Sequence, residues 1–436
     1  MAGTTKASGG QQLRQLGMVS AIAIIIANMI GTGIFTTTGF LVADLGSSTP
    51  VIAAWIVGGL MALCGALTYA ELAVNMPGNG GEYLYLSKLY HPAVGFLSGW
   101  VSLFAGFSAP IAAAAVAFGN YFKTIWPAVP PTISAIVLLL LFTFIHMYNV
   151  RLGGKVQNAF TIIKILLITG LIVAAFGWSG EPVRLSLSHG DWNTMISPVF
   201  AVSLIFVMYS YSGWNAAAYI GGEIKNPSRY LPLALVVGTI VVLIFYALLN
   251  IIYVTMVPLT TIAGEVEVAH IVAQAMIGNT GAKIVSILIL LALITSVSAM
   301  IMAGSRVYQM MGEDHTFFSW LAKRADNNSP VNAIILQAAI SLILILTLSF
   351  DAILYYVGFT LSLFAGLTVF SVFLLRKKGK STAGYRTWGY PVTPVLFLLV
   401  TGWMVIYTLV DRTFESFIGL LTLLLGLGIY FLLLKK

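Results

Sequence analysis

The sequence predicts an all-α membrane protein with twelve transmembrane helices. Of its 436 residues, 59% are apolar and 8% are charged, and the mean hydropathy is +0.96. The charged residues gather in short segments between apolar runs of about 20 residues, the length an α-helix needs to cross a bilayer. No cleavable signal is expected, because the start is polar and the first apolar run is too long for a signal core.

Charged or turn-forming residues bound each of the predicted spans. In order along the chain the spans cover residues 17–43, 50–75, 95–122, 131–150, 156–178, 193–221, 231–256, 281–310, 331–349, 352–375, 392–410 and 414–434.

Loop charge predicts the orientation. With the N-terminus in the cytoplasm, 17 lysines and arginines fall in inner segments and 4 in outer segments, and Lys164 is left inside a span. Positive residues concentrate on the cytoplasmic side of membrane proteins, so both termini are expected there. The net charge of +8 follows from this bias and does not indicate nucleic-acid binding.

The first span is interrupted near its middle by Gly31, Thr32 and Gly33. Paired glycines weaken a helix and allow backbone angles that are closed to other residues. In lipid, freed backbone groups are tolerated only where they face protein or a watery cavity. Such a break indicates either a site that grips a small polar molecule or a close helix–helix contact, for which small residues are also favoured.

The sixth span carries a second interruption at residues 209–215, Tyr-Ser-Tyr-Ser-Gly-Trp-Asn. The two breaks lie five spans apart, and because five is odd, a repeated second half would be inserted upside down. Interrupted segments at corresponding positions of two halves point to a transporter's binding site. The alternative is that two unrelated polar patches fall in register by chance.

The chemistry of two such breaks suits a zwitterion. Each break frees N–H groups at the start of one half-helix and C=O groups at the end of the other. The N–H groups suit a carboxylate and the C=O groups suit an ammonium. Because neither break contains an acidic or basic side chain, we expect a neutral or small amino acid as the substrate.

Lys164 lies among apolar neighbours in the fifth span. An ionisable residue inside the membrane is costly to bury and is a functional candidate by default. The alternative is that its side chain snorkels to the interface, although Lys164 lies about two turns into the span.

Other classes of function lack support in the sequence. Cys64 is the only cysteine and the five histidines are scattered, so no disulfide within the chain and no metal site are expected. There is no Walker-type phosphate loop and no nucleophile motif. We therefore expect neither an enzyme with catalytic residues nor an ATP-driven pump, and no cofactor.

Four motifs, in order along the chain, resemble the APC superfamily, and within it the L-type amino acid transporter (LAT) family and bacterial alanine–serine–cysteine and serine/threonine exchangers. They are residues 31–35 (GTGIF), 77–83 (PGNGGEY), 211–215 (YSGWN) and 223–227 (EIKNP). The resemblance implies a leucine-transporter-like fold with a 5+5 inverted repeat, broken helices 1 and 6, and two further helices.

On this pattern the chain divides into four parts. They are a cytoplasmic N-terminal tail (1–16), a first inverted repeat with helices 1–5 (17–180), a second inverted repeat with helices 6–10 (193–376), and helices 11 and 12 (392–434).

The resemblance also implies roles for residues of both breaks. The backbone N–H groups of Thr32 and Gly33, with the Thr32 hydroxyl, would take the substrate carboxylate. Carbonyls of Met29, Tyr209 and Ser212 would take its ammonium. The expected substrate-binding residues are Met29, Gly31, Thr32, Gly33, Tyr209 and Ser212.

Two positions depart from the family pattern. Tyr209 falls where the family usually has a phenylalanine that closes over the substrate as an outer gate, and a buried tyrosine hydroxyl needs a partner or water. Ser212 stands where many relatives have glycine. The expected pocket is therefore slightly narrower and favours small substrates.

In the resemblance, a lysine at the position of Lys164 replaces the second sodium ion of sodium-driven relatives and bridges the first and eighth helices. Its expected partners are Gly31, or a carbonyl near it, and Ser296 or Ser298. A fixed positive charge there argues against sodium coupling.

We therefore expect a sodium-independent exchanger of small neutral L-amino acids (alanine, serine, threonine or cysteine) that works by alternating access. A proton-coupled uptake carrier, with Lys164 or Glu71 titrating, is the main alternative. A non-transporting amino acid sensor is less favoured, because the expected tails are too short for a signalling domain.

The expected setting is a bacterial inner (plasma) membrane. Mammalian LAT-type light chains link to a heavy chain through a cysteine in the outer loop after the third span, and residues 122–131 contain none. We therefore expect small neutral amino acids and the lipid bilayer as partners, and no disulfide-linked heavy chain. Residues 258–278 are expected to form a helical extracellular lid.

Overall fold

The computed structural model describes residues 16–148, 154–178, 180, 189–314, 316–325, 329–381 and 384–434. Within these ranges the chain is helical and contains no strand. Two isolated β-bridges pair Leu16 with Ile224 and Asn79 with Ile220.

The secondary-structure elements comprise α-helices and short π and 3-10 segments, the latter two labelled η. In chain order they are α1 (Met18–Met29), α2 (Gly33–Leu45), α3 (Ser48–Asn75), α4 (Glu82–Leu89), α5 (Pro92–Val101), η1 (Ser102–Ser108), α6 (Ala109–Lys123), α7 (Pro131–Tyr148), α8 (Gly154–Phe176), α9 (His189–Met195), α10 (Pro198–Tyr211), α11 (Ala216–Tyr219), η2 (Gly221–Glu223), α12 (Pro227–Met256), α13 (Leu259–Ile262), α14 (Val268–Asp314), η3 (Thr316–Ala322), α15 (Val331–Thr347), α16 (Phe350–Lys377), α17 (Val392–Asp411), α18 (Thr413–Ile429) and η4 (Tyr430–Leu434).

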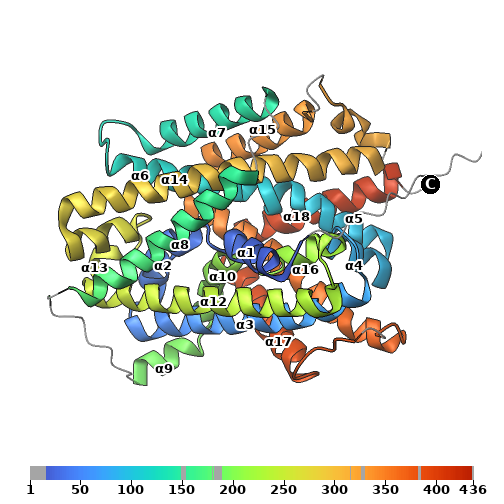
Figure 1. The fold of residues 1–436 in the computed structure, drawn as a ribbon, viewed down its shortest axis with the longest axis horizontal. Helices are drawn as coiled ribbons and strands as arrows, with labels where there is room; N and C mark the ends of the chain where they lie inside the picture. Colours follow the sequence, from blue (N-terminus) through green and yellow to red (C-terminus); the bar gives the residue numbers. More distant parts are fainter. Residues whose placement is uncertain are drawn as a thin grey trace, which may run out of the picture.

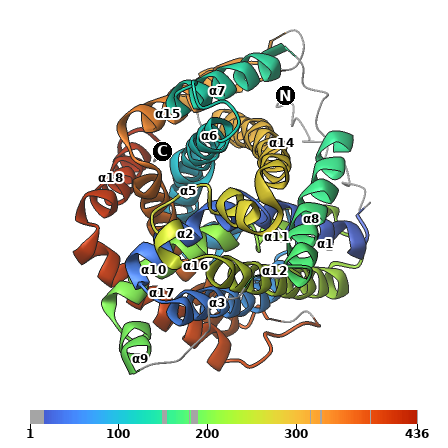
Figure 2. The same cartoon turned by 90° about the vertical axis from the view of Figure 1, so that its left-hand side faces the viewer.

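The long helices run along the long axis of the molecule and form a bundle, seen from the side in Figure 1 and after a 90° turn in Figure 2. α12 packs along α3, and α14 packs against α6, α7 and α15. α4 and α13 lie at opposite ends of the bundle in Figure 1. The broken segments α2 and α10 pack against each other inside the bundle, while α1 packs on α12 and lies toward the edge of the molecule in Figure 2.

Among the described residues, eight helices are long and apolar enough to cross a membrane, and ten spans result if each of two bent helix pairs counts as one. The bent pairs are α1 with α2, at 43°, and α9 with α10, at 65°. Two shorter apolar helical segments, residues 161–176 of α8 and residues 331–347 of α15, fall below this length. The all-helical membrane fold with broken helices is therefore confirmed, while the count of twelve spans stays a prediction.

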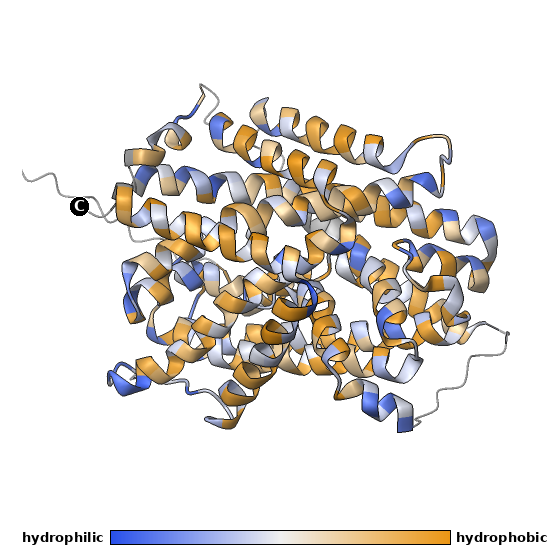
Figure 3. Ribbon diagram, turned by 180° about the vertical axis from the view of Figure 1, so that it is seen from behind, coloured by the Kyte–Doolittle hydropathy of each residue, from blue (hydrophilic) through white to orange (hydrophobic). Residues whose placement is uncertain are grey.

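The outer surface of the bundle is apolar, as lipid contact requires. Leu166, Ile343, Leu399 and Leu424 are each at least 58% exposed. Figure 3 shows hydrophobic residues along the middle of the helices and most hydrophilic residues toward the two ends of the molecule. In lipid the backbone polar groups must be paired within the protein, and an α-helix pairs them within a single segment.

The element boundaries differ most from the prediction at the sixth and eighth spans. The sixth span was expected from residue 193, but α10 begins at Pro198, because Ser197 caps the helix by accepting from the Phe200 N–H at 3.4 Å. The eighth span was expected from residue 281, but α14 extends back to Val268 through a non-helical Gly278. This early part of α14, together with α13, forms the helical segment expected over residues 258–278.

Candidate functional site

The first break separates α1 from α2. α1 ends at Met29, Ile30 leaves the helical region with ψ of 89°, and α2 begins at Gly33. The first N–H groups of α2 have no earlier turn of their own helix to bind. The break therefore presents N–H groups from α2 and carbonyl groups from α1 to the same space.

The second break follows α10. The helix ends at Tyr211, Ser212 has a ψ of 144° and Gly213 a φ of +99°, a value that favours glycine. The Ser212 N–H donates to the Tyr209 carbonyl at 3.0 Å. The chain becomes helical again only in the short α11, so the expected unwinding of this segment is present.

The two breaks pack directly against each other. A Cβ on Gly33 would lie 2.2 Å from Ser210 Oγ and 2.7 Å from Ser210 Cα, so α2 approaches α10 as closely as glycine allows. A Cβ on Gly213 would lie 2.9 Å from the backbone of Asn28. Thr37 Oγ1 and Ser210 Oγ are 3.1 Å apart. The close helix–helix contact is therefore present at the breaks, and their role as a binding site stays a prediction.

Tyr246 of α12 joins the two breaks. Its hydroxyl donates to the Met29 carbonyl at 2.6 Å, lies 3.3 Å from the Ser210 carbonyl, and is hydrogen-bonded by the backbone of Gly31. Sequence reasoning missed Tyr246. The available signal was a hydroxyl-bearing side chain inside the mostly apolar seventh span, and nothing in the sequence indicated its partner.

Tyr209 and Thr32 meet across the breaks. Tyr209 is 7% exposed and Thr32 is 5% exposed. The Tyr209 hydroxyl is within hydrogen-bonding reach of the Thr32 side chain. The polar partner that a buried tyrosine requires is therefore supplied by the first break. Ser212 is half-buried beside them in the second break.

Lys164 is buried in α8, at 7% exposure. Its ammonium donates to Ser296 Oγ of α14 at 3.0 Å, and Ser296 in turn donates to the Ala292 carbonyl. Among the hydrogen bonds of the described residues, none joins Lys164 to Gly31, whose backbone bonds Tyr246. The structure brings Lys164 together with the eighth predicted span and leaves its expected link to the first span unmade.

Ser298 has a different partner from Ser296. Its hydroxyl lies 2.8 Å from Nε2 of His146, a residue of α7 that is 5% exposed. The two alternative partners proposed for Lys164 are thereby separated: Ser296 contacts the lysine, and Ser298 contacts the histidine. Single-sequence reasoning had no signal for this contact, because His146 stands alone in an apolar run.

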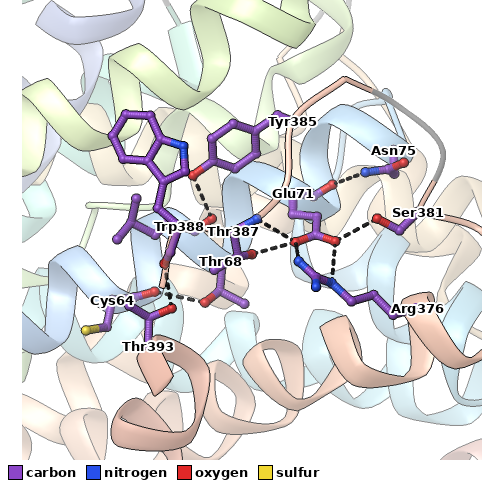
Figure 4. Close-up of polar contacts among 11 residues, drawn as sticks. Cys64, Thr68, Glu71, Asn75, Arg376, Ser381, Tyr385, Thr387, Trp388 and Thr393 are labelled. Atoms are coloured by element: carbon purple, nitrogen blue, oxygen red, sulfur yellow. Dashed lines mark hydrogen bonds and ion pairs between the residues drawn. The ribbon is translucent and has the colours of Figure 1, made fainter. Parts of the chain in front are cut away.

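Glu71, the other candidate for proton transfer, lies in a fully bonded cluster (Figure 4). Its buried carboxylate accepts two hydrogen bonds from Arg376, at 2.8 and 2.9 Å. It accepts three more, all at 2.7 Å, from Ser381 Oγ and from Thr387 N and Oγ1. Arg376 also lies 3.6 Å above the Tyr390 ring. These contacts tie α3 to α16 and to the segment before α17.

Comparison with known proteins matches the chain to one family. The sequence profile of the amino acid permease family matches residues 16–427, nearly the whole of the chain.

Curated relatives are similar over almost the full length. The serine/threonine exchanger SteT of Bacillus subtilis (strain 168) is 29% identical over 434 residues, which cover 97% of each protein. The large neutral amino acids transporter small subunit 2 of Homo sapiens is 29% identical over 97% of this chain and 81% of its own length. The b(0,+)-type amino acid transporter 1 of Homo sapiens is 29% identical over 96% of this chain and 88% of its own.

Proposed function

The chain belongs to the amino acid permease family, and we propose that it is a sodium-independent exchanger of small neutral L-amino acids that works by alternating access. The observation that carries the proposal is the direct packing of two uncharged helix breaks, Gly33 on Ser210 and Gly213 on Asn28. Two crossed breaks offer N–H and C=O groups within one small space, which matches a zwitterion.

The expected contacts follow from the ends of the half-helices. The N–H groups of Thr32 and Gly33, at the start of α2, would hold the carboxylate. Carbonyls of Met29, Tyr209 and Ser212 would hold the ammonium. The Met29 carbonyl already accepts from Tyr246 and the Tyr209 carbonyl from Ser212, and each carbonyl oxygen keeps a second lone pair for the substrate.

The side chains around the breaks support a small substrate. Tyr209 covers the space with its ring and is almost fully buried. Thr32 and Ser212 add hydroxyls, which a serine, threonine or cysteine side chain can bind. No acidic or basic residue lies within residues 28–33 or 209–215, so a charged side chain of the substrate would find no ionic partner there. Alanine, serine, threonine and cysteine fit these conditions.

Lys164 supports independence from sodium. Its ammonium occupies a buried position and donates to Ser296. A fixed cation repels a second one across a short distance of low-dielectric protein. A sodium ion is therefore unfavourable at this point of α14.

Counterflow in proteoliposomes tests the proposal. Purified protein is reconstituted with internal unlabelled serine, and uptake of labelled alanine, serine and threonine is followed with sodium and then with choline. Exchange predicts uptake that requires internal amino acid and is equal in both salts. Loss of uptake in choline would refute sodium independence. Uptake that needs an inward proton gradient and no internal amino acid would favour the proton-coupled carrier.

The proposed setting is the plasma membrane of a bacterium, with both termini in the cytoplasm and no disulfide-linked heavy chain. The chain's single cysteine, Cys64, is buried within α3 and is therefore out of reach of a partner subunit. Exchange by the purified chain alone supports this proposal. Activity that appears only when a second subunit is added would contradict it.

A further inference from the structure

Glu82 is a buried carboxylate at the end of the bundle opposite the α13 segment. It is the first residue of α4, follows a turn in which Gly80 and Gly81 have φ of +110° and +49°, and is 8% exposed. Burying a carboxylate costs free energy unless hydrogen bonds or charges compensate for lost water. None of the ion pairs among the described residues involves Glu82. Its neutral partners therefore have to supply the compensation.

These partners come from α3, from α11 and from the residue directly before α11. Tyr69 of α3 donates its hydroxyl to Oε1 at 2.6 Å, and Asn215 donates its amide to the same oxygen at 3.0 Å. The Tyr219 side chain of α11 also hydrogen-bonds the carboxylate. Glu82 is thus bonded on one side to α3 and on the other to the chain that directly follows the second break.

Backbone contacts reinforce the same junction. The Gly80 N–H donates to the Tyr219 carbonyl at 3.0 Å, and the Gly222 N–H donates to Asn79 Oδ1 at 3.1 Å. A Cβ on Gly81 would lie 2.8 Å from the Tyr219 ring. The turn before α4 therefore packs against α11 without intervening space.

The junction also reaches the break itself. The Tyr69 ring meets the Trp214 ring edge to face, with centroids 4.6 Å apart, and Trp214 directly follows Gly213. One tyrosine of α3 therefore touches both the carboxylate and the segment that carries the candidate binding groups. A change in that segment cannot leave the Glu82 contacts unaffected, because Asn215 belongs to it.

We propose that Glu82 is a positioning residue that holds α11 against α3 and α4, so that the end of the molecule nearest α4 stays closed while the second break has its present form. This inference rests on the proposed transport function and deepens it, by assigning the contact that must be lost before the substrate can leave toward the predicted cytoplasmic side. Glu82 holds the junction by accepting hydrogen bonds and not by an ion pair, because its donors are neutral side chains.

Labelling of a reporter cysteine tests this inference without requiring transport. In a Cys64→Ala background, Ala217→Cys places a thiol on the buried face of α11. A membrane-impermeant maleimide is applied to inside-out vesicles, and the labelling rate is compared among variants. Glu82→Ala should raise the rate about fivefold, the factor expected for the loss of about 1 kcal/mol of hydrogen bonding.

Two further variants make the outcome specific. Glu82→Gln keeps an oxygen that accepts from Tyr69 and Asn215, so its labelling rate should not rise above that of the parent. Asn215→Ala removes one donor and leaves the carboxylate in place, so it should also raise the labelling rate. It keeps the proposal testable if Glu82→Ala fails to fold. The matched control is Glu223→Ala, because this nearby half-buried carboxylate accepts a long 3.4 Å bond from Asn79 and no other side-chain bond among the described residues.

The proposal is overturned if Glu82→Ala and Asn215→Ala label at the parent rate. It is also overturned if Glu82→Gln labels as fast as Glu82→Ala, because the charge and not the acceptor would then hold the junction. Faster labelling in a protein that exchanges no amino acid would contradict the proposed function alone. Normal exchange with unchanged labelling would contradict the role of Glu82 alone.

Discussion

At the scale of single residues, Ser296 and Ser298 of α14 offer a direct test of Lys164. Lys164→Ala should alter the balance of conformations, because the removed ammonium donates from α8 to Ser296 of α14. Transport should fall, and the apparent affinity measured from one face of the membrane should shift more than that from the other. Sided uptake and efflux in oriented vesicles would measure this.

Ser296→Ala should move transport in the same direction as Lys164→Ala, because it removes the same hydrogen bond and leaves the buried ammonium without this partner. The matched control is Ser298→Ala, because this hydroxyl contacts His146 instead of the lysine. If Lys164→Ala has the parent's turnover and the same apparent affinity for substrate from both faces of the membrane, the lysine is only a packing residue.

Tyr209 is predicted to affect turnover more than binding. Tyr209→Ala removes a nearly buried ring, while the groups proposed to hold the substrate's carboxylate and ammonium belong to the backbone. Closing motions often limit turnover in such proteins, so we expect the exchange rate to drop about tenfold with a smaller change in apparent affinity. Tyr209→Phe isolates the hydroxyl that reaches Thr32. A raised affinity constant at unchanged turnover would show that the ring only lines the pocket.

The stability of the closed form is predicted to depend on pH, because Glu82 is titratable. Burial raises the pKa of Glu82 above its ordinary 4.5, and the hydrogen bonds from Tyr69, Asn215 and Tyr219 offset part of that rise. The groups that face the carboxylate, including Tyr85, are tyrosines or amides and stay neutral near pH 7. The closed form is therefore favoured below pH 4.5, and this contribution is lost as the pH rises through the raised pKa.

Acidification of inside-out vesicles toward that range should accordingly slow labelling of the Ala217→Cys reporter relative to a free-thiol standard at each pH. Glu82→Gln should remove this dependence, because the amide does not titrate. An identical pH profile in parent and Glu82→Gln would place the titrating group elsewhere.

At the scale of elements, the contact between the breaks predicts a difference between two neighbouring glycines. Gly33→Ala should reduce substrate binding strongly, since its Cβ would meet Ser210 at 2.2 Å. Gly31→Ala should be milder, because the nearest atom to its Cβ lies at 3.9 Å. Binding of alanine by the purified variants, measured by calorimetry, tests this pair. Partial recovery in Gly33→Ala combined with Ser210→Gly would identify the clash as the cause, and equal loss in both glycine variants would contradict it.

The sequence predicted the breaks better than it predicted their contacts. Residues 31–33 and 209–215 indicate an interruption of the helix, because glycines and clustered hydroxyl-bearing residues are unusual in the middle of a span. The Ser197–Pro198 pair also carried a helix-start signal, which the estimate of the sixth span passed over. Tyr246, by contrast, is 217 residues from Met29, so no local pattern could indicate their hydrogen bond. The choice between Ser296 and Ser298 likewise depends on helix rotation, which a single span does not specify.

At the scale of the whole molecule, polar clusters hold both ends of the broken helices. At the α4 end, Glu82 binds Tyr69 and Asn215. At the α13 end, Asp44 of α2 accepts from Ser203 at 3.4 Å and from Tyr355 at 3.3 Å. Under the proposed alternating access, each of these clusters would open in turn while the other stays closed. Their hydrogen-bond partners are largely neutral, which keeps the cost of exchanging them for water small.

Glu71 is predicted to contribute to the stability of the whole fold and not to proton coupling. Its carboxylate has five hydrogen bonds that join α3, α16 and the segment leading to α17, so a proton would have to displace Arg376. Glu71→Ala removes the partner of a largely buried guanidinium, which costs about 3 kcal/mol in comparable pairs. We expect a lower thermal unfolding temperature in detergent.

The pH dependence of exchange distinguishes a structural role of Glu71 from a role as proton carrier. Whatever Glu71→Ala protein remains folded should exchange amino acids with the parent's dependence on pH, because a residue held by Arg376, Ser381 and Thr387 in this way belongs to the fixed frame of the bundle. The matched variant is Ser381→Ala, which removes one of the five bonds and should lower the unfolding temperature only slightly. If Glu71→Ala instead unfolds at the parent's temperature and loses a steep acid activation present in the parent, Glu71 carries the proton and the exchange mechanism gives way to proton-coupled uptake.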